Sequence, residues 1–150
     1  MTLVLDIKEQ IKDAMRAKDT LRLTVLRGLS AAFTNELVNQ KRRPDEELSD
    51  DDALTVIMRE SKKRKDSIEQ FTAAGRTDLA ETEQAELAIL ETFLPAQMSR
   101  DEIVAYVTEA KAKSGVTDPT QKGIFMGTLM KELKGKADGN IVKEVVEGMF

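Results

Sequence analysis

Cysteine, histidine and tryptophan are all absent from this chain of 150 residues. Without cysteine there is no disulfide and no thiol nucleophile, and without histidine the commonest general base is missing. Together the two absences remove the usual zinc ligands and the familiar Ser-His and Cys-His nucleophile pairs. We therefore predict a protein with no catalytic residue, no metal and no cofactor.

Aromatic residues are scarce at 4%, and three prolines interrupt the sequence. Good helix formers such as alanine, glutamate, lysine and leucine dominate the remainder. The apolar fraction of 41% is enough to build a core. We therefore predict an all-α protein, with an N-terminal long-helix bundle over residues 1–95 and a small three-helix domain over residues 96–150.

Long apolar runs are missing as well. Nothing approaches the roughly 18 consecutive apolar residues of a membrane-spanning helix, so we expect no membrane partner. The opening Met1-Thr2-Leu3-Val4-Leu5-Asp6 has no basic residue ahead of its short apolar run, unlike a secretory signal. A cytoplasmic location is the resulting expectation.

Apolar residues recur at helical spacing in four stretches of the first part. Pro44 should end the second stretch, because the residue before a proline avoids the α region. The expected helices run from Leu3 to about Lys18, from a cap at Asp19 to about Lys41, from a cap at Ser49 to Gly75, and through Leu79 to just before Pro95.

The second part begins after a predicted hinge at Pro95-Ala96-Gln97. Ser99 and Glu102 form a capping box, with Met98 and Ile103 placed for a hydrophobic staple, and the helix should reach about Lys113. A further helix is expected from a cap at Asp118 to Gly135, and the last one follows Asp138.

The net charge of −4 means that any nucleic-acid-binding role needs a local basic patch. Arg59–Lys65 holds five basic residues against Glu60, and Pro119–Lys143 holds five lysines against two carboxylates. Exposed aromatics for base stacking are few, which favours contacts to phosphates and to RNA shape. A solvated face paired with acidic neighbours is the alternative for the first stretch. The candidate phosphate contacts are Lys122, Lys131, Lys134, Lys136, Lys143, Lys62, Lys63 and Arg64.

Lys134-Gly135-Lys136-Ala137-Asp138-Gly139 places two lysines and two glycines on an expected turn between helices. Glycine lets the backbone approach a ligand closely, and the lysines with the free N–H groups of the next helix would suit a phosphate. An ordinary interhelical turn with solvated lysines explains the same pattern. Both interpretations stay open at this point.

Gly123 and Gly127 lie four residues apart on one face of an expected helix. Each glycine costs about 1 kcal/mol relative to alanine in a helix interior, so a close approach should compensate. A neighbouring helix is the favoured reason, and an RNA backbone is the alternative. The candidate close-approach glycines are therefore Gly123, Gly127, Gly135 and Gly139.

Carboxylates cluster at two places in the sequence: Asp50 to Asp52, and Glu81, Glu83 and Glu86. A catalytic pair needs carboxylates that converge on one pocket with separated pKa values. The aspartates instead occupy the first turn of an expected helix, where they stabilise its dipole. We predict catalysis at neither group.

Several short stretches, taken together, are specific for one family. They are Leu21-Arg22, Leu26-Arg27, Asn35-Glu36, Lys62-Lys63-Arg64-Lys65-Asp66-Ser67, Ala74-Gly75-Arg76-Thr77-Asp78-Leu79, Glu86-Leu87-Ala88-Ile89-Leu90 and Leu94-Pro95-Ala96-Gln97-Met98-Ser99. With them the chain resembles the YqeY-like family over nearly its full length. Met126-Gly127-Thr128-Leu129-Met130 and Leu133 to Gly139 also resemble the C-terminal tail domain of the GatB component of aspartyl/glutamyl-tRNA amidotransferase.

The resemblance implies a two-part helical fold and a tail that contacts tRNA. It implies no chemistry, because the catalytic centres of the amidotransferase lie in parts that this chain lacks. A carbon–nitrogen ligase activity with glutamine as amide donor would belong to such a complex. Where the family often has a basic residue between the glycines at positions 123 and 127, this chain has Ile124-Phe125-Met126. Lys134 and Lys136 are therefore the main RNA contacts that the resemblance implies.

Three hypotheses follow. The first is a non-catalytic tRNA-binding accessory protein. The second is an interaction module that docks another protein, with the tRNA-dependent amidotransferase as a candidate partner. The third is an enzyme, which without histidine or cysteine would have to use lysine, serine or carboxylate chemistry.

Overall fold

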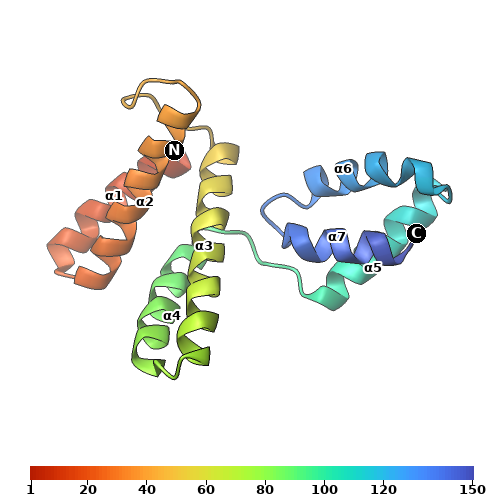
Figure 1. The fold of residues 1–150 in the computed structure, drawn as a ribbon. Coiled ribbons are helices and arrows are strands. Elements are labelled where there is room, and N and C mark those ends of the chain that lie inside the picture. Colours follow the sequence, from red (N-terminus) through yellow and green to blue (C-terminus); the bar gives the residue numbers. More distant parts are fainter. The chain divides into compact units, whose positions relative to one another are not determined.

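Seven α-helices and one short 3₁₀ turn make up the computed structural model, which describes residues 1–150 and contains no strand (Figure 1). The predicted all-α class is confirmed. The helices are α1 (Leu3–Ala17), α2 (Thr20–Asn39), α3 (Asp50–Ala73), α4 (Thr77–Glu91), α5 (Arg100–Ser114), α6 (Lys122–Glu132) and α7 (Gly139–Gly148), with the 3₁₀ turn η1 (Pro119–Gln121) before α6. None of these helices combines the length and apolar character needed to cross a membrane.

The chain divides into two compact units, Met1–Leu94 and Pro95–Phe150. In the first unit, α1 packs on α2, and α3 packs along α4 as a second helical hairpin (Figure 1). Side chains from all four helices form the core, including Ile7, Leu26, Ile57 and Leu90, each at most 1% exposed. Burial of such side chains, at about 25 cal/mol per Å² of apolar surface, is the main stabilising term of the unit.

Capping residues set the beginnings of these helices. The side chains of Thr2, Asp19 and Ser49 each accept a hydrogen bond from a backbone N–H in the first turn of α1, α2 and α3. The caps predicted at Asp19 and Ser49 are confirmed. By contrast, α4 begins after Arg76 without a side-chain cap, two residues before the Leu79 that marks it in the sequence.

The second unit consists of α5, η1, α6 and α7. Both α5 and α6 pack on α7, and their shared core includes Ile103, Val107, Leu129 and Val146. The capping box at Ser99 and Glu102 is present in full, as predicted. Met98, the expected partner of Ile103 in a hydrophobic staple, packs against the same core.

The expected helix from Asp118 to Gly135 is shorter in the structure. Asp118 caps η1 through the N–H of Thr120, and the regular helix begins only at Lys122. It ends at Glu132, because Leu133 leaves the helical path and Gly135 adopts a φ of 80°. The residues that follow form a tight turn into α7, and that turn carries the two central candidate lysines.

Candidate functional site

Burial alternates along the turn between α6 and α7. Leu133 and Ala137 are each 4% exposed and belong to the core of the second unit, whereas Lys134 and Lys136 are exposed. Gly135 lies between the lysines, is buried, and has the left-handed φ that glycine adopts without strain. The alternation therefore directs both lysines outward from a backbone that is anchored on the core.

The segment before α5 holds this turn in place. The backbone N–H of Met98 donates to the carbonyl oxygen of Lys136 at 2.8 Å, and the side-chain amide of Gln97 donates to the carbonyl oxygen of Gly135 at 2.8 Å. The predicted hinge residue Gln97 thus clamps the turn of its own unit. Lys134 and Lys136 consequently project from a braced loop, which lowers the entropy cost of ordering them on a ligand.

The five candidate lysines of residues 122–143 share one electrostatic property: none of them forms an ion pair. The structure contains eleven ion-pair contacts of 4.0 Å or less, and Lys122, Lys131, Lys134, Lys136 and Lys143 take part in none. All are exposed except Lys122, which is half-buried. Their charges are therefore uncompensated within the fold.

The structure brings only some of these lysines close together. Lys131, Lys134 and Lys136 gather at the carboxyl end of α6 and on the turn that follows. Lys122 lies at the opposite end of α6, about 14 Å away along the helix at 1.5 Å per residue. Lys143 lies on α7. We call the three lysines at the carboxyl end of α6 and on the turn that follows, Lys131, Lys134 and Lys136, the basic turn.

The beginning of α7 is a less favourable place for a phosphate than the sequence suggested. The Asp138 carboxylate already accepts the N–H of Asn140 at 2.8 Å as the helix cap. A carboxylate at this position also repels an incoming phosphate. The cap and its charge both disfavour an anion at this helix end, so the lysine side chains are the stronger candidates for contacts to a phosphate.

The four candidate glycines differ in their surroundings. A Cβ added to Gly123 or Gly127 would meet nothing within 4 Å, so packing of a neighbouring helix, the favoured explanation from the sequence, is wrong for both. A Cβ at Gly139 would lie 3.1 Å from the terminal methyl carbon of Met130, which is a true close approach between α6 and α7. Gly135 is required by its φ.

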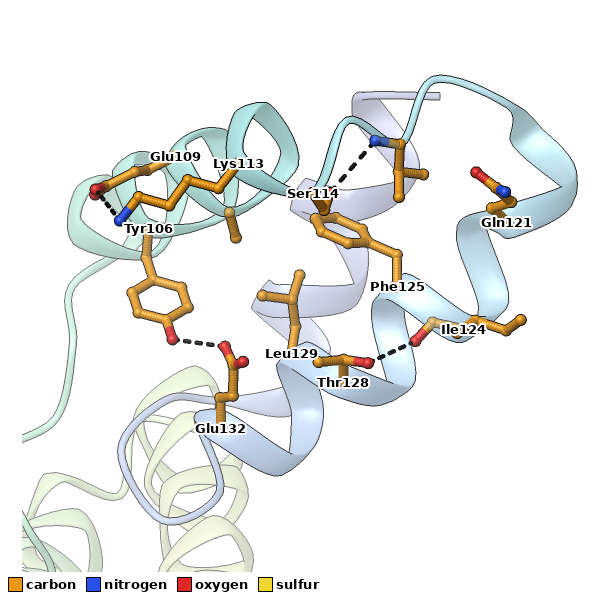
Figure 2. Close-up of a pocket in the computed structure, with 12 residues that line it drawn as sticks. Tyr106, Glu109, Lys113, Ser114, Gln121, Ile124, Phe125, Thr128, Leu129 and Glu132 are labelled. Carbon is orange, nitrogen blue, oxygen red and sulfur yellow. Dashed lines mark hydrogen bonds and ion pairs between the residues drawn. The ribbon is translucent and has the colours of Figure 1, made fainter.

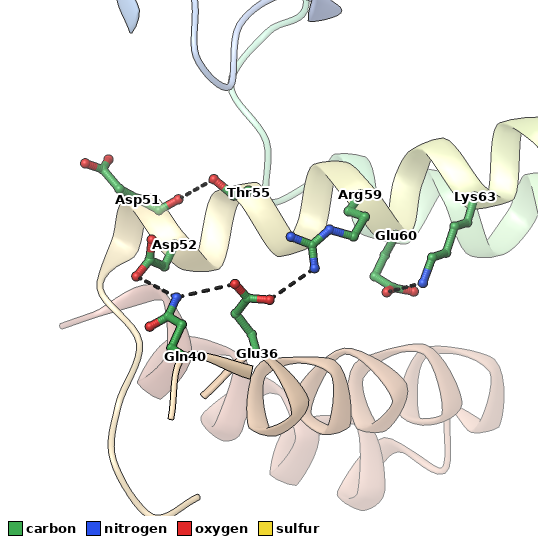
Figure 3. Close-up of polar contacts among 8 residues, drawn as sticks. All are labelled: Glu36, Gln40, Asp51, Asp52, Thr55, Arg59, Glu60 and Lys63. Carbon is green, nitrogen blue, oxygen red and sulfur yellow. Dashed lines mark hydrogen bonds and ion pairs between the residues drawn. The ribbon is translucent and has the colours of Figure 1, made fainter. Parts of the chain in front are cut away.

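The basic stretch Arg59–Lys65 is largely engaged by neighbouring carboxylates. Figure 3 shows Arg59 of α3 reaching Glu36 of α2 at 3.1 Å, and Lys63 paired with Glu60 at 3.3 Å. Lys62 is exposed and forms no ion pair. This stretch accordingly presents less uncompensated charge than the basic turn.

Arg64 is turned toward α4 rather than toward solvent. Its guanidinium lies 3.4 Å from a Glu83 oxygen and 3.2 Å from a Glu86 oxygen, and its side chain is 24% exposed. Two of the carboxylates singled out in the sequence thus bind a structural arginine. No group of acidic side chains in the structure is arranged to hold a metal ion.

A groove of about 700 Å³ lies between α5 and α6 in the second unit, and it was not foreseen from the sequence (Figure 2). The two helices pack on α7 and make little contact with each other, which leaves the space between them open. Ala110, Phe125 and Leu129 give it an apolar lining, and Ile124 stands at its edge with 78% of its surface exposed. In the sequence, the one feature that could have indicated this groove is Ile124, a large aliphatic residue that lies between Gly123 and Gly127 and away from the apolar seam of its helix.

One end of the groove is bridged by a polar contact. The Tyr106 hydroxyl on α5 donates to the Glu132 carboxylate on α6 at 2.7 Å. This hydrogen bond, together with burial and the negative charge of Glu132, raises the pKa of Tyr106 above its ordinary value of 10.0. Farther along α5, Lys113 lies 2.8 Å from Glu109, and its hydrogen bond lowers the pKa of that carboxylate.

Comparison with known proteins gives a consistent result over the whole chain. A family model described as Yqey-like protein matches residues 5–150. The protein named "Altered inheritance of mitochondria protein 41, mitochondrial" from Kluyveromyces lactis is 32% identical over 150 residues, covering 96% of this chain and 80% of that protein. Its namesakes from Vanderwaltozyma polyspora and Pyrenophora tritici-repentis are each 28% identical, covering 98% and 94% of this chain and 81% and 77% of their own lengths.

Proposed function

Because this chain belongs to the family of Yqey-like proteins, we propose that it is a tRNA-binding accessory protein without catalytic activity of its own. The resemblance of residues 126–139 to the tail of the amidotransferase component GatB suggests the ligand. The basic turn of Lys131, Lys134 and Lys136 would supply the contacts. Lys122 and Lys143 would add phosphate contacts at the flanks.

The observation that carries this proposal is the absence of ion pairs at all five lysines. An exposed lysine paired with a carboxylate must lose that partner before it can bind a phosphate, whereas an unpaired lysine loses only water and counterions. In the other basic stretch Arg59, Lys63 and Arg64 are paired, whereas Lys62 and Lys65 beside them are not. The five unpaired lysines of residues 122–143 support a phosphate-binding surface in the part of the chain that resembles a tRNA-contacting tail.

The proposed contacts recognise phosphates rather than bases. The structure offers few aromatic surfaces for stacking, since Phe33 and Phe125 are buried and the remaining aromatics are half-buried. Lysine is a flexible point charge that suits phosphate oxygens without a fixed geometry. Recognition would then follow the spacing of phosphates in a folded RNA, as is usual for proteins that read RNA shape.

A salt titration of binding tests the proposal. Purified total tRNA should bind the protein at about 50 mM salt and weaken steeply toward 200 mM, with a logarithmic slope of about −2 to −4 if three to five lysines contact phosphates. Absence of binding by the folded protein at low salt would overturn the proposal. A slope near zero would equally contradict it, because contacts of this kind release counterions.

The proposed compartment is the cytoplasm, where tRNA is abundant, although the fungal relatives carry the word mitochondrial in their names. Microscopy of the tagged protein, or fractionation of cells, checks this part separately. Recovery of the protein in an organelle fraction would move the proposed ligand to the tRNA of that organelle and leave the basic turn unchanged.

A further inference from the structure

The groove between α5 and α6 is an apolar surface that the second unit does not cover with its own chain. Its deepest residues, Phe125 and Leu129, belong to the core, yet Ile124 beside them keeps 78% of its surface exposed. Exposing a large aliphatic side chain beside an apolar depression is unfavourable for a free protein. An occupant that buries Ile124 would remove that cost.

The walls of the groove determine the shape of a suitable occupant. They are two helices that both rest on α7 and make little contact with each other apart from the Tyr106–Glu132 bridge (Figure 2). Side chains on helices form ridges and grooves, and another helix fills such a space by ridges-into-grooves packing. The residues of α5 that line the groove run from Tyr106 to Ser114, about 12 Å at 1.5 Å per residue, enough for about two turns of a docked helix.

Charge defines the chemistry of that helix. Three charged side chains line the groove, and two of them, Glu109 and Lys113, neutralise each other at 2.8 Å. Glu132 has no cationic partner; its one polar contact is the hydroxyl of Tyr106. A Lys or Arg entering here would meet a carboxylate without an ion-pair partner beside an aromatic ring, a combination that favours cations.

We propose that this groove docks an amphipathic helix of a partner protein that carries a Lys or Arg beside its apolar ridge. The apolar ridge covers Ile124 and packs over Phe125 and Leu129, and the cation pairs with Glu132 at the Tyr106 end. This surface is distinct from the basic turn, so the inference goes beyond the proposed RNA contact. A groove with an uncompensated carboxylate disfavours RNA phosphates.

Synthetic helices titrated into the isotopically labelled full-length protein test this docking site. One peptide of about 16 residues carries leucines on one face with flanking Lys and Arg; a second replaces the basic residues by Glu; a third has the first composition in scrambled order. The first peptide should shift the backbone amide signals of α5 and α6 that line the groove. The second and third should bind at least about tenfold more weakly.

Two groove variants and one control sharpen the experiment. Ile124→Glu should weaken the basic peptide about tenfold or more, because the apolar contact at the rim is lost. Glu132→Lys should reverse the preference in favour of the acidic peptide. Val38→Glu alters an aliphatic residue with 53% exposure on α2 of the other unit, and it should leave peptide binding unchanged.

Each contrary outcome overturns the proposal. It fails if the basic peptide does not bind at millimolar concentration, or if the shifted signals lie outside the groove. It fails also if groove signals change on dilution without peptide, which would identify a second copy of this chain as the occupant. Shifts at the groove caused by tRNA instead of peptide would assign the surface to RNA. Retained tRNA binding by Ile124→Glu keeps this result separate from the proposed function.

Discussion

The hydroxyl of Tyr106 on α5 and the carboxylate of Glu132 on α6 meet at 2.7 Å and bridge two helices that otherwise make little contact. Tyr106 is the single tyrosine of a chain without tryptophan. The ultraviolet absorbance of its phenolate therefore reports on this one contact. Few features of the fold can be measured so directly.

A pH titration of Tyr106 should give a pKa above 10.0, because the hydrogen bond to Glu132 favours the neutral phenol. Since the folded pKa is raised, the stabilising contribution is complete below about pH 10 and disappears as the pH rises through the folded pKa. Glu132→Gln keeps an acceptor but removes the charge, so the pKa should move back toward 10.0. An unchanged pKa in this variant would show that the contact does not form in solution.

Replacing Gly127 by alanine should stabilise the second unit by up to about 1 kcal/mol, because it lies inside α6, and Gly123→Ala in the first turn should give a smaller gain. The structure offers open space for either methyl group. Chemical denaturation followed by circular dichroism measures the gain. Gly135→Ala is the matched contrast: its φ of 80° disfavours a side chain, and a loss of about 1–2 kcal/mol is expected. Destabilisation by the α6 alanines would contradict the structure.

Asp138→Asn separates two effects of the Asp138 carboxylate: it caps α7, and its charge repels phosphate near the basic turn. Asparagine caps a helix about as well as aspartate, so stability should change by less than about 0.5 kcal/mol. Loss of the negative charge should raise tRNA affinity a few-fold at low salt, because the repulsion of phosphate near Lys134 and Lys136 is removed. Equal or weaker binding by the folded variant would argue against phosphates at this turn.

Arg64→Met should destabilise the first unit by about 1–3 kcal/mol, because Glu83 and Glu86 lose their shared charged donor. The neighbouring exposed residue gives the control, and Lys62→Met should change stability by less than about 0.5 kcal/mol. Urea unfolding of the two variants provides the comparison. Equal stability of Arg64→Met and the unaltered protein would mean that the ion pairs between α3 and α4 contribute little.

Helix positions were predictable because local signals agree with the tertiary structure. The caps at Asp19, Ser49 and Ser99 and the spacing of apolar residues located the helices, and the structure moved their ends by only a few residues. The largest difference is the 3₁₀ turn at Pro119–Gln121. It arises because Asp118 bonds to the N–H of Thr120 before the regular helix can begin.

Candidate site residues were harder to interpret, because their roles depend on neighbours distant in sequence. Arg64 could not be distinguished from Lys62 until α4 brought Glu83 and Glu86 beside it. The exposure of Gly127 and the groove beside it likewise depend on how α5 and α6 rest on α7. A sequence pattern indicates which residues can carry charge, whereas only packing determines which charges stay uncompensated.

Binding of total tRNA at about 50 mM salt, compared between two charge-reversed proteins, tests the central claim most directly. One carries Lys134→Glu and Lys136→Glu on the basic turn; the other carries Lys62→Glu and Lys63→Glu on α3. Circular dichroism confirms the fold of each. We expect the basic-turn variant to lose at least about tenfold in affinity and the α3 variant to lose clearly less. Equal loss in both proteins, or full binding by the basic-turn variant, would contradict the account.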